Sequence, residues 1–159
     1  MLKGVIIGTG FWSNFQIPAW RELPGVTITA LYNLTFEKAK AIGEKFGISN
    51  IYDNAETLLD KEHPDFVDII TDVDTHAYFT KLVAERHIDV ICQKPMAPSL
   101  AMAGEMVKAC ASNNVRLFIH ENFRWQLPVR KLKEALDSGI IGRPFKARVS
   151  FCSAFPVFD

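Results

Sequence analysis

The chain has 159 residues, of which 48% are hydrophobic and 23% charged, and its formal net charge is +0. This length fits one domain with a small appendage and is enough to bury a core, while the balanced charge disfavours nucleic acid or an anionic membrane as partner. No apolar run approaches the ~18 residues of a membrane span, and we expect no secretory signal.

The order of apolar and helical patterns predicts the fold. In chain order it predicts strand 2–8, helix 12–23, strand 25–33, helix 35–47, strand 48–52, helix 53–60, strand 65–71, helix 75–87, strand 88–93, helix 99–114 and strand 115–122. Such alternation predicts a parallel sheet covered on both faces. Right-handed crossovers then favour a doubly wound, Rossmann-type α/β fold with strand order 3-2-1-4-5-6.

The last part of the chain departs from this alternation. An amphipathic helix is predicted over 127–139, with Leu132 and Leu136 on one face, and a turn over 140–144. Residues 145–151 alternate apolar and polar side chains, which predicts an antiparallel strand that needs a partner. We therefore predict a first domain over 1–126 and, over 127–159, a connecting helix and the first strand of an incomplete second domain.

The cysteines indicate the cellular compartment. Cys92, Cys110 and Cys152 lie far apart and form no C-x-x-C pair. This usage predicts reduced thiols in a cytoplasmic protein, with Cys92 and Cys110 in the core.

A glycine pattern follows the first strand. Gly8 and Gly10 occupy the first two places of G-x-G-x-x-G, and Ser13 occupies the third. Gly8 suits a tight turn, and Gly10 allows the backbone to approach a pyrophosphate at a helix N-terminus. The third place requires only a small residue, which serine is. The pattern predicts a dinucleotide cradle, and the alternative is a plain glycine turn.

Asn33 ends the second strand, where an acidic residue usually binds the adenosine ribose. An amide can hydrogen-bond a ribose hydroxyl but brings no charge to repel a 2′-phosphate. No arginine follows, since Leu34 and Thr35 come next, and the sequence favours NAD over NADP. The alternative is that Asn33 only forms a turn.

Polar residues also follow the fourth strand. Thr71, Asp72 and His76 lie where open α/β sheets bind ligands, and we expect them to contact the cofactor. Asp72 and His76 could form a metal site or an acid–base pair, but no third ligand is evident and we predict no metal. Alternatively, Asp74 or Thr75 caps the next helix.

The fifth and sixth strands end in two further polar stretches. Gln93, Lys94 and Pro95 follow the fifth strand, and a lysine there can reach a cleft to bind substrate or transfer a proton. Asn122 and Trp125 follow the sixth and suit a nicotinamide or sugar site. The alternatives are a solvated loop lysine and a loop in which Trp125 is a packing anchor.

Together these motifs resemble the Gfo/Idh/MocA family of NAD(P)-dependent oxidoreductases, which includes glucose–fructose oxidoreductase and inositol dehydrogenase. The resemblance covers residues 2 to about 155, and Lys94–Pro95 is its most specific element. It implies cofactor binding at Gly8, Gly10, Phe11 and Trp12, with Asn33 near the adenosine ribose. It also implies that Lys94 is catalytic, at the junction of nicotinamide and substrate, and that Gln93, in place of the family's glutamate, lies near the nicotinamide ribose.

The chain departs from the family in several places. Asn33 leaves the choice of cofactor open, Gln93 removes a charge, and residues 71–76 lack the family's prolines. Family members are about twice as long, and their second domain supplies the substrate wall and an acid/base histidine in a D-x-x-x-H pair. Asp72 and His76 have that spacing in the other domain, so the role is not transferred. We therefore expect a truncated chain.

Three functions are consistent with these observations. The first is the cofactor-binding portion of a dehydrogenase that transfers hydride between nicotinamide and a sugar- or polyol-like substrate, with little or no turnover alone. We expect such a protein to form a homo-oligomer, in which the C-terminal strand can be the contact. The second is a non-catalytic dinucleotide-binding module that acts through self-association, with its last strand as the contact, or through a partner chain. The third is a domain for a different nucleotide, against which Lys94–Pro95 argues.

Overall fold

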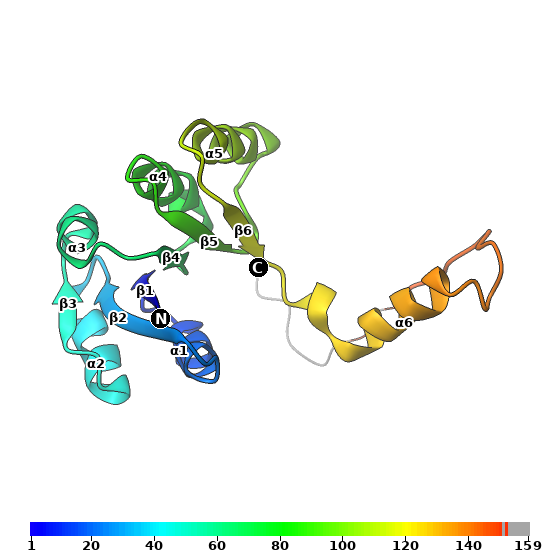
Figure 1. Cartoon of the computed structure of the whole chain (residues 1–159), viewed down its shortest axis with the longest axis horizontal. Coiled ribbons are helices and arrows are strands. Elements are labelled where there is room, and N and C mark those ends of the chain that lie inside the picture. The colour runs from blue at the N-terminus through cyan, green and yellow to red at the C-terminus, as the bar shows by residue number, and fades with distance from the viewer. Residues whose placement is uncertain (151, 153–159) are drawn as a thin grey trace. The chain divides into compact units, whose positions relative to one another are not determined.

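The computed structural model describes residues 1–150 and 152 and divides the chain into two compact units, 1–120 and 121–159. The first unit is built on one parallel sheet with the order β3-β2-β1-β4-β5-β6, as predicted (Figure 1). Its strands are β1 (Leu2–Ile7), β2 (Val26–Tyr32), β3 (Asn50–Tyr52), β4 (Phe66–Ile69), β5 (Asp89–Gln93) and β6 (Leu117–His120).

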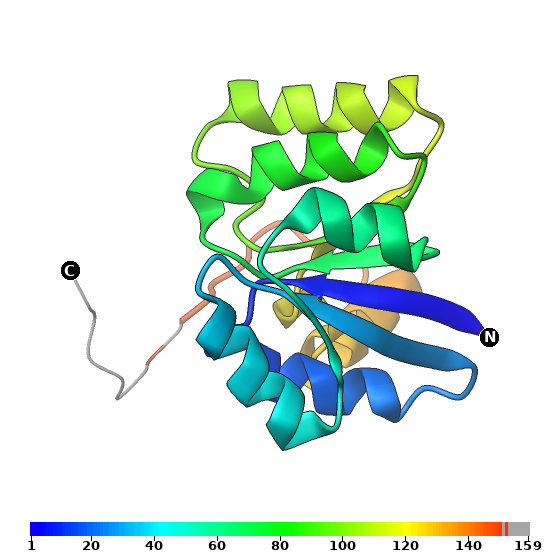
Figure 2. The ribbon, with the colours of Figure 1, turned by 90° about the vertical axis from the view of Figure 1, so that its left-hand side faces the viewer.

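Five helices cover the sheet of the first unit. They are α1 (Ser13–Arg21), α2 (Phe36–Phe46), α3 (Ala55–Glu62), α4 (Val73–Ala84) and α5 (Leu100–Ser112). Figure 2 shows α1 and α2 on one face of the sheet and α3, α4 and α5 on the other. Each face has its own core, one centred on Ile6, Ile17 and Leu31 and the other including the buried Cys92 and Cys110. The prediction that these two thiols lie in the core is confirmed.

Local signals set several helix boundaries. Asn54 and Ser99 precede α3 and α5, and their side chains accept hydrogen bonds from the amides of Thr57 and Met102 at 2.7 and 3.3 Å. Such caps satisfy backbone donors that have no partner within the helix. At the other end of α2, Gly47 adopts a left-handed φ of 63° and ends the helix as predicted.

Helix α4 begins two residues earlier than predicted, and Asp72 rather than Asp74 or Thr75 occupies its N-cap. The reason is local, because the Thr75 hydroxyl donates back to the Asp72 carbonyl at 2.8 Å and joins the first turn instead of starting it. The helix ends at Ala84, before His87 turns to a left-handed φ of 57°.

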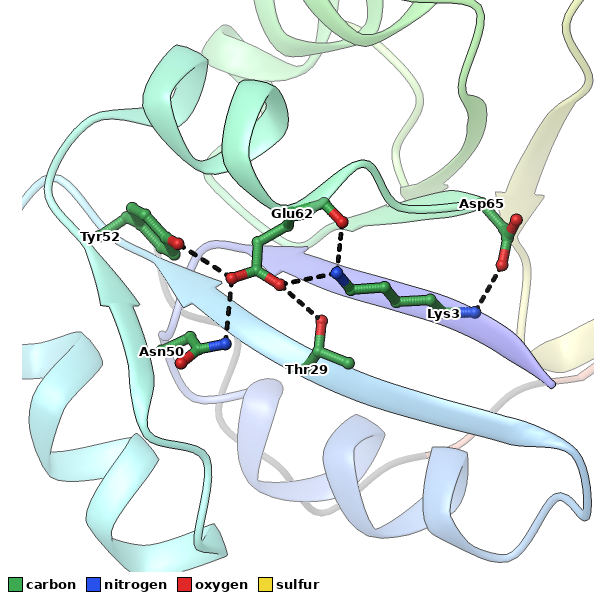
Figure 3. Close-up of polar contacts among 6 residues, drawn as sticks. All are labelled: Lys3, Thr29, Asn50, Tyr52, Glu62 and Asp65. Atoms are coloured by element: carbon green, nitrogen blue, oxygen red, sulfur yellow. Dashed lines mark hydrogen bonds and ion pairs between the residues drawn. The ribbon is translucent and has the colours of Figure 1, made fainter.

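A buried carboxylate fastens the end of α3 to the sheet (Figure 3). Glu62 is only 7% exposed, and it accepts hydrogen bonds from Tyr52 at 2.9 Å, Asn50 at 3.0 Å and Thr29 at 3.2 Å. The Lys3 ammonium forms an ion pair with it at 3.0 Å. Burial alone would raise the pKa of Glu62, but these donors outweigh it and lower the pKa below its usual value.

The second unit contains a short 3₁₀ helix, η1 (Phe123–Trp125), and the predicted helix, α6 (Leu127–Asp137). Leu132 and Leu136 lie one turn apart and are 58% and 40% exposed. The predicted strand does not form over 145–150, and Phe151 lies outside the described residues. A strand needs a hydrogen-bonding neighbour, and none is present among the described residues of this unit.

Candidate cofactor-binding cleft

The turn after β1 requires glycine at its first position. Gly8 has φ +103°, and its amide donates to the Tyr32 carbonyl of the neighbouring strand at 2.8 Å. A Cβ built on Gly8 would lie 2.8 Å from the backbone of Ile70 and 2.9 Å from the Thr71 side chain. Position 8 therefore requires glycine for two reasons, its left-handed φ and the lack of room for a Cβ.

Glycine at the second position, Gly10, is explained differently. A Cβ on Gly10 would meet nothing within 4 Å, so packing of the chain itself does not demand glycine here. Ser13 is fully buried, and its hydroxyl donates to the Gly10 carbonyl at 2.7 Å. The buried serine therefore stabilises the loop through a hydrogen bond, while the space next to Gly10, just before α1, stays open. A backbone left bare before a helix N-terminus is the arrangement that admits a phosphate group.

Asn33 follows β2 beside this loop. Its side-chain oxygen accepts a hydrogen bond from the Thr9 amide at 3.1 Å, and its amide nitrogen donates to the Thr35 carbonyl at 3.2 Å. The side chain thus ties the glycine loop to the β2–α2 turn. One amide hydrogen remains to donate to a ribose oxygen, and the side chain carries no charge.

A cleft of about 580 Å³ opens at the carboxyl ends of β1, β2 and β4. It brings together five of the predicted site residues, namely Gly8, Gly10, Asn33, Thr71 and Asp72.

Sequence reasoning missed much of the opposite wall of this cleft. Tyr78 and Phe79 of α4 form an edge-on ring pair with centroids 5.1 Å apart, and Lys38 of α2 also lines the cleft. Lys38 lies in the first turn of α2 and Tyr78 and Phe79 lie in the second turn of α4, and no fixed spacing from the glycine motif marks any of the three. An apolar wall with a few polar groups suits a planar base and its ribose.

His76 lies outside that lining. It is 1% exposed, Nε2 is 3.0 Å from the Thr71 carbonyl, and Nδ1 is 3.0 and 3.3 Å from the carbonyls of Pro95 and Met96. With both nitrogens facing backbone oxygens, the ring is not available to a metal or to the cofactor. Asp72, in contrast, lies on the cleft.

The turn after β5 carries Lys94. The Lys94–Pro95 peptide bond is cis, and the Lys94 ammonium lies 5.9 Å from the centre of the Trp12 ring. Gln93 is 8% exposed, and its side-chain oxygen accepts a hydrogen bond from the Lys94 amide at 2.8 Å. The amide that replaces the family's glutamate therefore supports the turn. Lys94 does not line the 580 Å³ cleft but approaches the glycine loop from β5.

Aromatic side chains surround the start of α1. Phe11, Trp12 and Phe15 pack on one another with ring centres 5.2 to 5.9 Å apart and are 70%, 43% and 55% exposed. Of these three rings, that of Trp12 lies near the Lys94 ammonium.

Asn122 and Trp125 belong to the second unit. In that unit the Arg124 guanidinium stacks on the Trp125 ring at 5.2 Å, and Trp125 is 63% exposed. Their predicted part in the site stays a prediction.

The residues present fit a dinucleotide. The bare backbone at Gly10 suits the pyrophosphate, the cleft suits the adenosine, and Lys94 and Trp12 lie near each other outside the lining of the cleft. Among the described residues, no cluster of three or more histidine, cysteine, aspartate or glutamate side chains could hold a metal ion. The described helices include none with the length and apolar character needed to cross a membrane. Fold and cleft together define a dinucleotide-binding domain of the Rossmann type.

Comparison with known proteins supports a dinucleotide-binding domain and shows its family. The family described as "Oxidoreductase family, NAD-binding Rossmann fold" matches residues 2–121, and the chain belongs to this Gfo/Idh/MocA family. It is 46% identical to a D-apiose dehydrogenase from Paraburkholderia graminis and 42% identical to one from Rhizobium rhizogenes. Each alignment covers 99% of this chain but 42% and 46% of the relative, respectively, so the chain spans less than half the length of either protein.

A solved structure is also similar. An oxidoreductase from Agrobacterium radiobacter, in complex with NAD⁺, L-tartaric acid and magnesium, superposes with a TM-score of 0.88 at 41% identity. The match covers 91% of this chain and 42% of that one. The predicted family and Rossmann-type fold are confirmed.

Proposed function

We propose that this chain is the NAD-binding portion of a dehydrogenase that transfers hydride between nicotinamide and a hydroxyl or carbonyl group of a sugar- or polyol-like substrate. The observation that carries the proposal is the open backbone at Gly10 beside the cleft. The names of the two D-apiose dehydrogenases support a sugar as substrate.

The residues of this chain have distinct parts in the proposed reaction. Bound NAD would supply the hydride acceptor. The glycine loop and the N-terminus of α1 bind its pyrophosphate, and Asn33 donates to the adenosine ribose. Lys94, at the end of β5, hydrogen-bonds the reacting oxygen of the substrate and orients it, and Trp12 lies beside the Lys94 ammonium. We expect the 159-residue chain by itself to bind cofactor with little or no turnover, since it spans less than half the length of the two D-apiose dehydrogenases.

NAD is the proposed cofactor, and NADP is the one to test beside it. Asn33 brings neither the charge that repels a 2′-phosphate nor one that binds it. Lys38 lines the cleft and can reach such a phosphate. The cytoplasm remains the expected compartment, because free thiols suit a reducing environment.

Titration of the chain with NADH and with NADPH, followed by tryptophan fluorescence, tests the proposal. We expect saturation with NADH and a quench that is lost in Trp12→Phe, which assigns the signal to the loop. A folded chain that neither nucleotide saturates would contradict cofactor binding.

The second candidate function is a non-catalytic module that binds a dinucleotide and self-associates. The observation in its favour is the exposed apolar side of α6, which includes Val129, Leu132 and Leu136. Light scattering tests the module, since a chain that stays monomeric at all concentrations argues against it.

A further inference from the structure

His76 bridges two loops at the carboxyl edge of the sheet. It lies in the first turn of α4 and is 1% exposed. One side of its ring faces the Thr71 carbonyl after β4, and the other faces the carbonyls of Pro95 and Met96 after β5. Thr71 lines the cleft, and Pro95 follows Lys94.

The chemistry of these contacts makes the histidine the donor. All three partners are backbone carbonyl oxygens, which only accept hydrogen bonds, so the protons must come from the ring. A neutral imidazole donates from one nitrogen and a doubly protonated ring from both. A hydrophobic side chain of the same size would leave the carbonyls without this donor.

We infer that His76 is a positioning residue that holds the Lys94 turn and the Thr71 loop in place relative to each other. This double link uses the ring with both nitrogens protonated: Nδ1–H donates to the backbone just after Lys94, and Nε2–H donates to the Thr71 carbonyl of the cleft wall. Gln93 completes the arrangement, because its side chain accepts from the Lys94 amide on the preceding side. The part this plays in hydride transfer rests on the proposed function, whereas the link between the loops does not.

Two substitutions separate the two sides of the ring. His76→Asn places an amide N–H₂ near the position of Nδ1 and has nothing at Nε2. His76→Gln carries its N–H₂ near the position of Nε2 and has nothing at Nδ1. His76→Asn should therefore keep the Lys94 turn and release Thr71, and His76→Gln should do the reverse. A residue that only fills space would respond to both variants in the same way.

Two measurements on the 159-residue chain report on the two loops, one on the Lys94 turn and one on the Thr71 loop. The Lys94 side-chain resonance in ¹³C-lysine-labelled protein, assigned by its loss in Lys94→Arg, reports on the ring current of Trp12, 5.9 Å away. NADH titration reports on the cleft. We expect the resonance to move in His76→Gln and stay in His76→Asn. NADH affinity should fall by roughly tenfold in His76→Asn, the effect of one lost buried hydrogen bond, and stay within about twofold in His76→Gln.

The outcomes separate this inference from the proposed function. If the unmodified chain does not bind NADH, the proposed function fails, while the Lys94 resonance still tests the link between the loops. If both variants match the unmodified chain, or both move the resonance equally, the inference is overturned.

A measurement on the unmodified chain covers the case in which neither variant folds. A ring N–H that donates to a buried carbonyl is shielded from exchange with water, so at least one His76 imidazole proton should give a slowly exchanging NMR signal. Rapid exchange of both ring protons in the folded chain would overturn the inference.

Discussion

Asp68→Asn should make the stability of the first unit less dependent on pH. Asp68 lies in the middle of β4 with no exposed surface. Its Oδ2 accepts a hydrogen bond from the Trp20 indole at 2.7 Å, and its Oδ1 has no partner in the part of the chain that the structure describes. Burial raises the pKa of this carboxyl from 3.8 to about 7, and the Trp20 hydrogen bond offsets only part of that effect.

The sign follows from proton linkage. Between the unfolded and folded pKa values of Asp68, the folded state holds a proton that the unfolded state has lost, so stability falls as pH rises. A shift from 3.8 to about 7 spans about three pH units at about 1.36 kcal/mol each, or about 4 kcal/mol in all. The contribution is fully present below pH 3.8 and is lost as pH rises through about 7. The amide of the Asp68→Asn variant has no proton to lose in this range.

Urea unfolding of both proteins at several pH values between about 4 and 8, followed by tryptophan fluorescence, measures the effect. The two free energies of unfolding should be similar at the acid end, and Asp68→Asn should be the more stable by up to about 4 kcal/mol at the alkaline end. Glu105→Gln is the control, because Glu105 is exposed and the Lys81 hydrogen bond lowers its pKa, whereas burial raises that of Asp68. A difference between Asp68→Asn and the unmodified chain that does not change with pH would refute the reasoning.

Three further predictions concern a buried carboxylate and the two glycines of the loop. Glu62→Gln should lose about 2 kcal/mol in urea unfolding at neutral pH, because the amide presents donors to some of the groups that now donate to the carboxylate. That loss should become smaller as the pH falls through the lowered pKa of Glu62, because the carboxylate is then protonated and its stabilising contribution is lost. Gly8→Ala should unfold at a clearly lower temperature, since the left-handed φ and the Ile70 backbone both oppose a Cβ. Gly10→Ala should melt within a few degrees of the unmodified chain yet bind NADH more weakly, and equal affinity would show that the pyrophosphate lies elsewhere.

Short-range sequence patterns predicted much of the fold. The alternation of apolar strands and amphipathic helices predicted the strand order, and Asn54, Ser99 and Gly47 set helix ends where expected. These features depend on neighbours within a few residues, so the sequence displays them directly. The strand predicted over 145–151 does not form over 145–150, because a strand needs a hydrogen-bonding neighbour and the described residues supply none there.

The candidate site was only partly visible. Gly8, Gly10 and Asn33 could be placed because each follows a strand at a fixed spacing. Lys38 and Tyr78 line the same cleft from helices that have no fixed spacing to the motif, and they were missed. Their approach depends on how α2 and α4 pack on the sheet, which no local pattern states.

For this protein, the sequence by itself determined the class of fold, the glycine loop and the lysine after β5, because strand periodicity and turn chemistry are local. Tertiary structure alone decided what several polar side chains do. In the folded chain the side-chain oxygen of Asn33 accepts a hydrogen bond from the Thr9 amide, and both ring nitrogens of His76 face backbone carbonyls. Asp68 is buried and accepts a hydrogen bond from the Trp20 indole. In each case the partner belongs to another strand, helix or loop, and only folding brings the two within hydrogen-bond distance.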